Sequence, residues 1–579
     1  MRQTLSNPGP QWAVRLTISP GSEGELLTIA ARGENILNVH AEDGKLSACF
    51  MACITPNSVF PCKNHLEFSL EAAPVPMFVS VEWLGYCVRL YGNNMLLDED
   101  WPLGNLPSGD WDAEWVSGAC KVEFGTPDEQ AVGFETQFTG AMQYFTLPGS
   151  NTGVGDCMPF SRDGRYCLYY LFDRRGHRSK GGLGAHQWAQ ISSADLKTWT
   201  IHPLAIPITE QWEGSICTGS LIQKDTITYA FYAVRMSDGS PARMTWAESM
   251  DGVHFEKSGK YISLTEPYEP VSARDPMVFL GADGHYHMLV TTSLPALGSY
   301  GGCLAHLMSS DLMNWTQLDP FIVPGYADQP ECSDYFEWNG WYYLVFSNFA
   351  VARYRMSRLP FGPWIKPEYD ILDTVENQVV KTAAFGKRRL MSGFLARYPR
   401  TYAGNAITHE LVQNRDGTLG VRFVPEILPA FIKKLPVSDV RAESDEGRYE
   451  VKIASGVAGF RLRAMLQLFG DAALGGLSLM SGNLEHRLDF DRMARIILAM
   501  RPDHNFRMGD PRLQMKGVDL TCPIGIDLIV YRDILDLALA NGRAMTMRLS
   551  DNMSPGLSLS IYVQNGILSV TDITLELLC

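Results

Sequence analysis

The chain of 579 residues lacks any long run of apolar side chains. Nothing in it approaches the roughly 18 continuous apolar residues of a membrane-spanning helix. The N-terminal stretch MRQTLSNPGPQWAVRL also lacks the apolar core of a secretory signal. We therefore expect a protein that does not associate with a membrane and that is cytoplasmic.

An excess of positive charge is also missing. The sequence has 49 Lys and Arg against 64 Asp and Glu, a formal charge of −15. Such a chain repels phosphate overall, which argues against nucleic acid or an anionic membrane as partner. The richest basic run, Arg174–Lys180 (RRGHRSK), is short, and we predict a solvated loop there. A neutral or cationic ligand fits better.

The 12 cysteines include no metal-type C-x-x-C pair, and no EF-hand, zinc or nucleotide motif is found elsewhere. We therefore predict neither a metal nor a cofactor. Most cysteines have apolar neighbours, as at Cys49, Cys87 and Cys217, where cysteine acts as a small hydrophobic residue. Reduced thiols in a cytosol are the simplest interpretation.

Helical periodicity is nearly absent. Short runs rich in β-branched and aromatic residues recur instead, bounded by Gly, Asp, Asn and Pro; examples are YCLYYLF, ITYAFYAV, HYHMLVTT and WYYLVFS. This pattern is typical of strands, so we predict an all-β protein. Because the chain is too long for a single hydrophobic core, two to four domains are expected.

Three segments differ in their strand pattern. In residues 1–140, apolar and polar residues alternate as in a β-sandwich, and the run from Val79 to Leu97 resembles late strands of laminin-G or concanavalin-like sandwiches. Residues 433–579 are again β-patterned, with two strands predicted around a turn at Asn541-Gly542. We predict a β-sandwich at each end and a separate domain at residues 141–432.

The middle segment contains an internal repeat. DLKTW (195–199), DGVHF (251–255) and DLMNW (311–315) share an acid, a turn and an aromatic residue four places on, and FGPW (361–364) is a degenerate fourth copy. The first three start 251 − 195 = 56 and 311 − 251 = 60 residues apart. This period is typical of four-stranded propeller blades, so we predict a β-propeller.

Three acids stand directly before strongly apolar or aromatic strands: Asp156 in VGDCMPF, Asp275 in ARDPMVF and Glu331 in PECSDYF. Their separations, 275 − 156 = 119 and 331 − 275 = 56, correspond to two blades and one blade. Because the innermost strands run along the propeller axis, acids at equivalent positions would meet at one mouth of the channel. A single acid there more often caps a turn or pairs with an arginine such as Arg274. Three in register favour a ring of carboxylates with split pKa values, which glycoside cleavage requires.

Several blocks of the sequence resemble glycoside hydrolase family 32, the invertase, inulinase and levanase group. ARDPMVFLGADGHYHML is similar to the family's R-D-P block, PECSDYFEWNGWYYLVFS to its E-C block, SICTGSL to its F-S-G-S block and WAQISSADLKTW to its D-L-x-x-W block. The resemblance implies a five-bladed propeller followed by a C-terminal sandwich. The N-terminal sandwich is an addition to that plan.

The resemblance also implies residue roles. Asp156 matches the nucleophile, Asp275 the transition-state stabiliser and Glu331 the acid/base, while Arg274 would hold Asp275 and bind fructosyl hydroxyls. Further substrate-binding residues are expected in the F-S-G-S block and among nearby tryptophans, although large aromatic residues in a propeller often only pack between blades: Thr218, Ser220, Trp212 and Trp246.

The sequence departs from the family pattern next to two of the acids. Gly155 precedes Asp156 where the family has Asn, and Cys157-Met158-Pro159 follow where it has Pro-Asn. Pro330 replaces the aromatic residue before Glu331. We expect intact acids but a remodelled sugar-binding wall, because glycine has no side-chain amide to offer the sugar.

These observations predict a retaining glycoside hydrolase that cleaves terminal β-fructofuranosyl linkages of sucrose, fructo-oligosaccharides or fructans by double displacement. Its partner would be a fructose-containing oligosaccharide or polysaccharide. Two alternatives stay open. The chain is a related propeller enzyme for another furanoside, such as arabinose, or for a cyclic fructose dianhydride, or it is a carbohydrate-binding protein without turnover.

Overall fold

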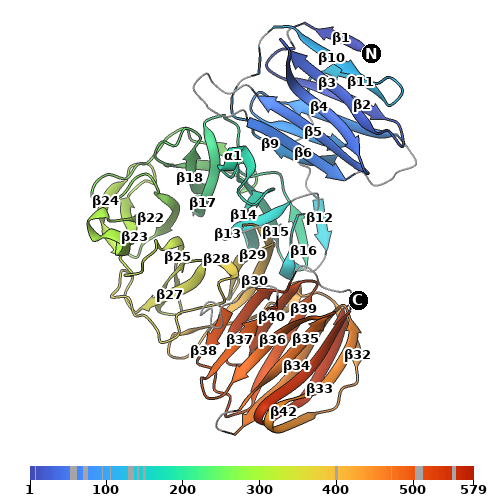
Figure 1. Ribbon diagram of the computed structural model, residues 1–579. Helices are drawn as coiled ribbons and strands as arrows, with labels where there is room; N and C mark the ends of the chain where they lie inside the picture. Colours follow the sequence, from blue (N-terminus) through green and yellow to red (C-terminus); the bar gives the residue numbers. More distant parts are fainter. Residues whose placement is uncertain are drawn as a thin grey trace.

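The computed structural model shows three β-rich parts in a row, with a five-bladed propeller between two sandwiches (Figure 1). This confirms the predicted fold class. The structure describes residues 1–6, 8–52, 62–69, 76–93, 95–104, 106–107, 109–127, 136–139, 142–147, 152–397, 402–470, 473–502, 513–550 and 556–578.

The N-terminal sandwich consists of two antiparallel sheets with strand orders β1-β10-β3-β4-β5-β6 and β11-β2-β7-β8-β9. Alternate side chains of both sheets face one core, where Trp12 packs edge-on against Trp111 with ring centroids 5.5 Å apart. The strands are β1 (Arg2–Leu5), β2 (Trp12–Ile18), β3 (Gly24–Ala31), β4 (Glu34–Glu42), β5 (Lys45–Ala52), β6 (Cys62–Ser69), β7 (Met77–Trp83), β8 (Val88–Gly92), β9 (Met95–Asp100), β10 (Trp111–Trp115) and β11 (Cys120–Gly125).

The propeller blades are antiparallel sheets whose first strands lie side by side around the axis. Blade one has β13 (Gly153–Arg162), β14 (Arg165–Asp173), β15 (Gln187–Ser193) and β16 (Thr198–Ile201), with α1 (Ser179–Gly182) between β14 and β15. Blade two has β17 (Glu213–Lys224), β18 (Ile227–Met236), β19 (Arg243–Ser249) and β20 (Glu256–Lys257). Blade three has β21 (Arg274–Leu280), β22 (Tyr286–Ser293), η2 (Pro295–Tyr300), β23 (Gly302–Ser309) and β24 (Thr316–Ile322).

Blade four has β25 (Glu331–Trp338), β26 (Trp341–Asn348) and β27 (Val351–Ser357). Blade five has β28 (Asn377–Phe385), β29 (Arg388–Ala396), β30 (Gly404–Gln413) and β31 (Leu419–Phe423), and η3 (Pro425–Ile427) follows it. The ring closes where β13 of blade one pairs with β30 of blade five at Val154 and Gly404. The first and last blades therefore share one sheet.

Strand β12 (Thr136–Thr139) pairs with β16 and so belongs to the sheet of blade one, although it lies within the range predicted for the N-terminal sandwich. The short helix η1 (Met142–Tyr144) follows it. The sheet of blade one therefore includes residues that precede residue 141, the predicted start of the propeller.

The repeated acids close the turn between the third and fourth strands of a blade. One carboxylate oxygen of Asp195 accepts hydrogen bonds from the backbone N–H groups two and three places on, and Asp251 and Asp311 make the same bonds. The indoles of Trp199 and Trp315 each donate to the carbonyl three places back. The repeat recurs because the same turn joins the third and fourth strands of blades one, two and three.

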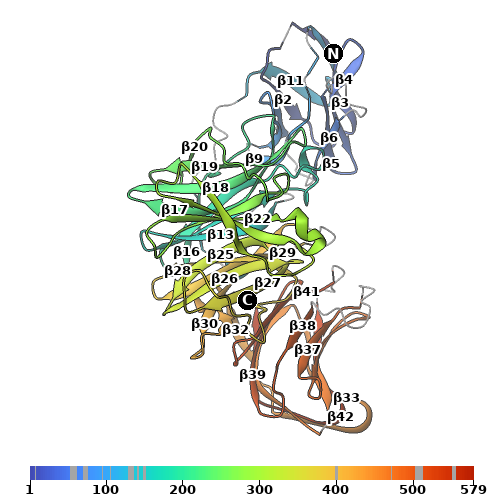
Figure 2. The same cartoon turned by 90° about the vertical axis from the view of Figure 1, so that its left-hand side faces the viewer.

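The C-terminal part is a sandwich whose two layers are joined by one long strand, β42, which pairs with β35 in its first half and with β34 in its second. Figure 2 shows β39 in one layer and β37 and β38 in the other. The strands are β32 (Phe431–Leu435), β33 (Val440–Val457), β34 (Gly459–Phe469), β35 (Leu474–Ser481), β36 (Leu484–Asp491), β37 (Ile496–Met500), β38 (Gln514–Lys516), β39 (Ile524–Tyr531), β40 (Ile534–Leu539), β41 (Ala544–Arg548) and β42 (Leu557–Leu578).

The turn predicted at Asn541-Gly542 joins β40 to β41, and Gly542 has the positive φ of 80° that such a turn requires. The surrounding segment was predicted as two strands, but it forms three. The sequence lacks a glycine at the additional turn, which Arg532 makes with a φ of 54°.

The joint between the N-terminal sandwich and the propeller is built from ion pairs. Arg175 binds Asp98 at 2.6 Å and also pairs with Asp100, while Arg174 lies 3.3 Å from Glu99. The prediction of a solvated loop at Arg174–Lys180 holds for the exposed His177 and Arg178 but is wrong for Arg174 and Lys180, which are buried next to the acids at the end of β9. Lys180 is 1% exposed and donates its backbone N–H to Asp100.

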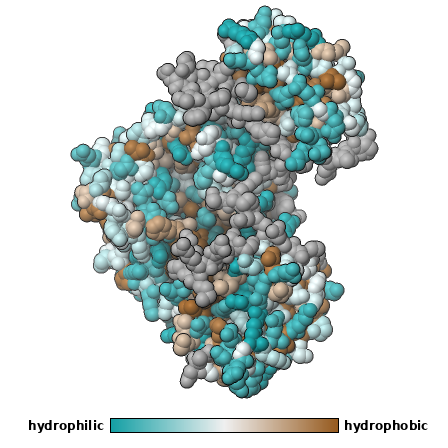
Figure 3. Space-filling view, in the orientation of Figure 1, coloured by the Kyte–Doolittle hydropathy of each residue, from teal (hydrophilic) through white to brown (hydrophobic). Residues whose placement is uncertain are grey.

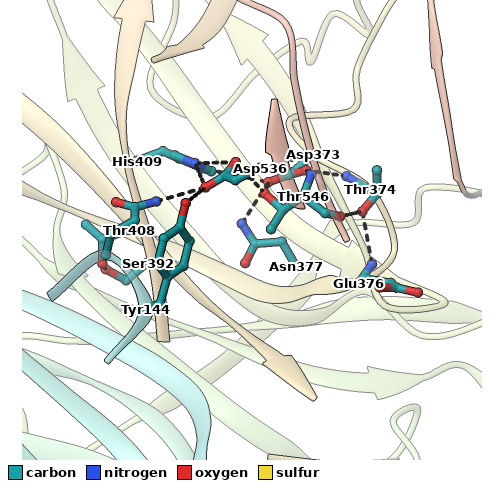
Figure 4. Close-up of polar contacts among 11 residues, drawn as sticks. Tyr144, Asp373, Thr374, Glu376, Asn377, Ser392, Thr408, His409, Asp536 and Thr546 are labelled. Atoms are coloured by element: carbon teal, nitrogen blue, oxygen red, sulfur yellow. Dashed lines mark hydrogen bonds and ion pairs between the residues drawn. The ribbon is translucent and has the colours of Figure 1, made fainter. Parts of the chain in front are cut away.

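The joint between the propeller and the C-terminal sandwich is a buried hydrogen-bond network (Figure 4). Asp536 of β40 accepts hydrogen bonds from the hydroxyl of Tyr144 at 3.2 Å and from His409 of β30 at 3.1 Å. Thr546 of β41 donates its hydroxyl to Asp373 at 2.8 Å and to Asp536 at 3.2 Å. Burial raises the pKa of Asp373. Burial tends to lower the pKa of His409, but the two carboxylates outweigh it and raise that pKa.

Hydrophilic residues predominate on the face of both sandwiches seen in Figure 3, with hydrophobic residues in small scattered patches. Among the described residues, no helix has the length and apolar character needed to cross a bilayer. The nine cysteines with described side chains form no disulfide.

Candidate active site

A β-bulge occurs in the innermost strand of each blade. In β13, β17, β21, β25 and β28, two residues oppose a single residue of the neighbouring strand; these pairs are 155–156, 217–218, 275–276, 332–333 and 379–380. A bulge bends its strand and re-aims the side chains beside it. Asp275, Cys332 and Val379 have φ angles of 54°, 51° and 53°, a strained region for residues other than glycine.

The three predicted acids all lie at these bulges. The repeat spacing predicted that the acids occupy equivalent positions in their blades, but they do not. Glu331 immediately precedes its bulge, Asp275 is the first bulge residue and Asp156 the second. The extra residue allows successive positions, and not only equivalent ones, to point toward the axis. Asp156 and Asp275 are 9% and 3% exposed, whereas the side chain of Glu331 is 34% exposed.

Both carboxylate oxygens of Asp156 accept hydrogen bonds. Oδ1 accepts one from the hydroxyl of Tyr402 at 2.9 Å, and Oδ2 accepts one from the hydroxyl of Thr218. The thiol of Cys332 lies 3.6 Å from Oδ2. Asp156 is thereby held by groups from blades two and four and by Tyr402, which lies just before β30 of blade five.

Arg274 joins the other two acids. Its Nη2 donates to Oε1 of Glu331 at 2.7 Å, and its Nε lies 3.7 Å from Oδ2 of Asp275. Asp275 also accepts the backbone N–H of Cys332 at 3.1 Å. Since Cys332 touches both Asp156 and Asp275, a continuous chain of contacts joins the three acids in one cluster, and we call the place where Asp156, Asp275 and Glu331 meet the pit.

Burial raises the pKa of Glu331 and that of Asp275; Arg274 opposes the rise in both, and the neighbouring acids add to it. Lys381 of blade five is buried close enough to Asp275 and Asp156 to interact with them electrostatically. It is 3% exposed, donates to the carbonyl of Gly219 at 2.8 Å, and has its pKa lowered by burial. A partly exposed carboxyl with a raised pKa beside a hydrogen-bonded carboxylate suits general acid catalysis.

The residues predicted to bind substrate are placed differently from one another. Arg274 lies at the pit, and Thr218 contacts Asp156 directly. The buried hydroxyl of Ser220 donates to the carbonyl of Pro276, the residue after Asp275, and so links blades two and three. Trp246 is 2% exposed and packs on Phe231 in a core between blades, so it offers no face to a sugar.

Trp212 is partly exposed and lies beside Tyr261, with ring centroids 6.2 Å apart. The guanidinium of Arg243 lies 5.6 Å from its ring centroid.

Besides Cys332 and Lys381, a group of three aromatic residues beside Asp156 was not predicted: Tyr402, His177 and His186. Tyr402 stacks on His177 and His186, with ring centroids 3.9 and 4.9 Å apart. Burial lowers the pKa of His177 to about 4. The only sequence signal for this group was indirect: the absent side chain at Gly155 leaves a space to be filled.

Within the described residues, no group of three or more His, Cys, Asp or Glu side chains is arranged to hold a metal ion.

The fold and site define a class of protein: a five-bladed propeller with three acids at the axial mouth and a β-sandwich after the last blade. Residues 158–359, which span most of blades one to four, match the glycosyl hydrolases family 32 N-terminal domain. The predicted resemblance to glycoside hydrolase family 32 is therefore confirmed, and this segment carries that family's domain.

Among curated relatives, the sucrose-6-phosphate hydrolase of Escherichia coli is 29% identical over 194 residues, covering 32% of this chain and 38% of the relative. The Salmonella typhimurium enzyme of the same name is 27% identical over 222 residues, covering 36% and 45%. The chain thus spans less than half the length of these relatives.

Solved structures match over a longer range. Fructan 1-exohydrolase IIa from Cichorium intybus superimposes with a TM-score of 0.60 at 17% identity, covering 76% of this chain and 97% of that one. Sucrose-6-phosphate hydrolase from Lactobacillus gasseri gives a TM-score of 0.58 at 18% identity, covering 76% and 93%. These matches show that most of this chain has the same fold as these two solved structures.

Proposed function

We propose that the chain is a retaining glycoside hydrolase that releases terminal β-fructofuranosyl units from sucrose, fructo-oligosaccharides or fructans. The observation that carries the proposal is the convergence of Asp156, Asp275 and Glu331 at one pit. The family 32 domain supports it, as do the named activities of the relatives. The chicory enzyme, for example, has been solved in complex with 1-kestose, a fructose-containing trisaccharide.

Each acid takes a distinct role in a double displacement. The carboxylate of Asp156 attacks the anomeric C2 of the fructosyl unit while Glu331 gives its proton to the departing oxygen, and the C2–O bond breaks. Water then attacks C2, gives its proton to Glu331 and displaces Asp156. Asp275 stabilises the positive charge that develops on the ring, while Arg274 holds Asp275 and binds fructosyl hydroxyls.

Burial supports these roles. The raised pKa of Glu331 favours the protonated form that the first step needs. Arg274 contacts both Glu331 and Asp275, so it orients the acid/base relative to the stabiliser.

The test is a substrate panel of sucrose, 1-kestose, inulin, levan and arabinan oligosaccharides with the variants Asp156→Asn and Glu331→Gln. We expect each substitution to lower kcat by at least about 10²–10⁴-fold, because a positioned acid/base contributes that much. Glu337→Gln, an exposed residue on the same strand as Glu331, is the matched control and should keep full activity. Near-normal turnover in either site variant would refute the assignment.

Stereochemistry tests the retaining mechanism separately. With methanol as acceptor, retention gives methyl β-fructofuranoside, whereas inversion gives the α anomer. NMR of the initial product distinguishes them.

Another furanoside is the second candidate substrate class. The observation in its favour is the altered wall beside Asp156, where a tyrosine ring occupies the space next to Gly155. Turnover of arabinan oligosaccharides but not of sucrose or fructans would support this candidate. Calorimetric binding without any product would instead indicate a carbohydrate-binding protein.

A further inference from the structure

The space beside the bulge of β13 is filled by a side chain from far along the chain. A Cβ atom placed on Gly155 would lie 2.4 Å from the hydroxyl oxygen of Tyr402 and 2.8 Å from its ring carbons. Gly155 therefore has no side chain because the tyrosine occupies that volume. Any larger residue at 155 has to push the ring away.

Tyr402 makes two contacts with the same residue. Its hydroxyl donates to Oδ1 of Asp156 at 2.9 Å and accepts the backbone N–H of Asp156 at 3.2 Å. The second bond fixes the hydroxyl oxygen against the bulge itself. Together with the bond from Thr218 to Oδ2, the tyrosine restricts rotation of the carboxylate.

Tyr402 is held in place by its neighbours. His177 and His186 stack on it, at interplanar angles of 30° and 25°. Both histidines are anchored to the buried Asp173, which accepts the backbone N–H of His177 at 3.1 Å and lies 3.0 Å from Nε2 of His186. The ring thus has little freedom to leave its position.

We propose that Tyr402 is a positioning residue for the Asp156 carboxylate, and that the absent side chain at Gly155 exists to admit it. The inference rests on the proposed function, in which Asp156 is the nucleophile. A carboxylate held at both oxygens presents its attacking lone pair in one direction, which matters because small misalignments of a nucleophile lower the rate steeply.

The first variant is Tyr402→Phe, which keeps the ring and its stacking and removes only the hydroxyl. We expect kcat to fall by about 10- to 100-fold, the effect of one hydrogen bond to a charged group. KM should change by less than about threefold, because Tyr402 acts on the nucleophile and not on the substrate. The matched control is Tyr343→Phe in blade four, which removes a buried hydroxyl bonded to the carbonyl of Gly417, between β30 and β31 of blade five, and should leave kcat unchanged.

The second variant is Gly155→Ala, which should lower kcat by a similar factor because the new methyl group displaces the ring. If both substitutions break the same contact, the double variant Gly155→Ala/Tyr402→Phe loses no more than either single one. Thermal unfolding of each variant, with a Tm within about 2 °C of the parent, separates this effect from general destabilisation.

Two results would overturn this inference and leave the proposed function intact. One is an active parent enzyme whose Tyr402→Phe variant is equally active, and the other is multiplicative losses in the double variant. A rise in KM at constant kcat would also count against it, since that would make Tyr402 a substrate contact. A parent enzyme that releases no sugar from the panel would instead overturn the proposed function, and the inference with it.

Discussion

The two sandwiches are attached to the propeller by different interactions: ion pairs at the N-terminal joint and a buried hydrogen-bond network at the C-terminal joint. The N-terminal joint consists of acids at the end of β9 and basic residues in the loop after β14, and Arg175 there keeps 16% of its side chain exposed. In the C-terminal joint His409, Asp373 and Asp536 have fully buried side chains, and both carboxylates accept several hydrogen bonds inside the protein. At the first joint Arg175 keeps partial access to water, whereas the charged side chains of the second joint have none.

The joints also differ in what lies beyond them. The loop held by β9 continues into His177, which stacks on Tyr402 and so adjoins Asp156. The C-terminal network ends on backbone and side chains of blade five and η1, with none of its members at the pit. From this difference we predict that changes at the N-terminal joint affect activity, whereas changes at the C-terminal joint affect stability alone.

The largest effect expected from this comparison is on stability at the C-terminal joint. Asp536→Ala removes the acceptor of His409 and of three further donors in a dry interior, so the free energy of unfolding should fall by about 3–5 kcal/mol. Calorimetric unfolding measures it, and kcat per folded molecule should not change. Asp527→Ala, a partly exposed ion-pair residue on the neighbouring strand, is the control, with an expected loss below about 1 kcal/mol. Equal losses in both variants would break the comparison.

The next effect is on activity at the N-terminal joint. The double substitution Asp98→Asn/Asp100→Asn removes the charges that hold Arg175, and we expect kcat to fall by roughly 3- to 10-fold as His177 loosens against Tyr402. Asp112→Asn, an exposed acid of the same sandwich paired with Arg2, should have no effect. A stability loss with unchanged kcat would show that this joint, too, is only structural.

The smallest effect is a difference in pH dependence. The raised pKa of His409 means that its contribution to stability is fully present below its ordinary value of 6.5 and is lost as the pH rises through the raised value. Asp173, beside His177, has a lowered pKa: burial opposes ionisation, but His186 and two backbone N–H groups outweigh it. Its contribution is present above the ordinary 3.8 and is lost as the pH falls through the lowered value.

Melting curves of the parent and of His409→Gln between pH 6 and pH 9 test the first direction. The difference in Tm should shrink as the pH rises. A difference that grows with pH would contradict the network as described.

The sequence was most informative where information is local. The blade turns at Asp195, Asp251 and Asp311 depend on residues within five positions, so their repeat was recognisable and gave the propeller. The R-D-P and E-C blocks likewise marked Asp275 and Glu331, because the bulge and the following strand are encoded beside each acid.

Contacts between distant segments could not be predicted in this way. Tyr402 lies 246 positions from Asp156, and the charges that bury Arg175 lie 75 and 77 positions before it. From the sequence alone a basic run such as Arg174–Lys180 is predicted to be solvated, because the distant acids that pair with it cannot be identified. Trp246 shows the converse: an aromatic residue suited to sugar stacking has no free face once a neighbouring blade packs on it.

The ring closes at Val154 and Gly404, so the candidate nucleophile lies where the first blade to be synthesised meets the last one. During synthesis, some 250 residues must emerge after Asp156 before its strand gains the partner that completes the circle (404 − 154 = 250). Tyr402 arrives in that same final stretch. A nascent or truncated chain that stops short of blade five would hold all three acids but lack Tyr402 and the closed ring, so the candidate site would be complete only after blade five has emerged.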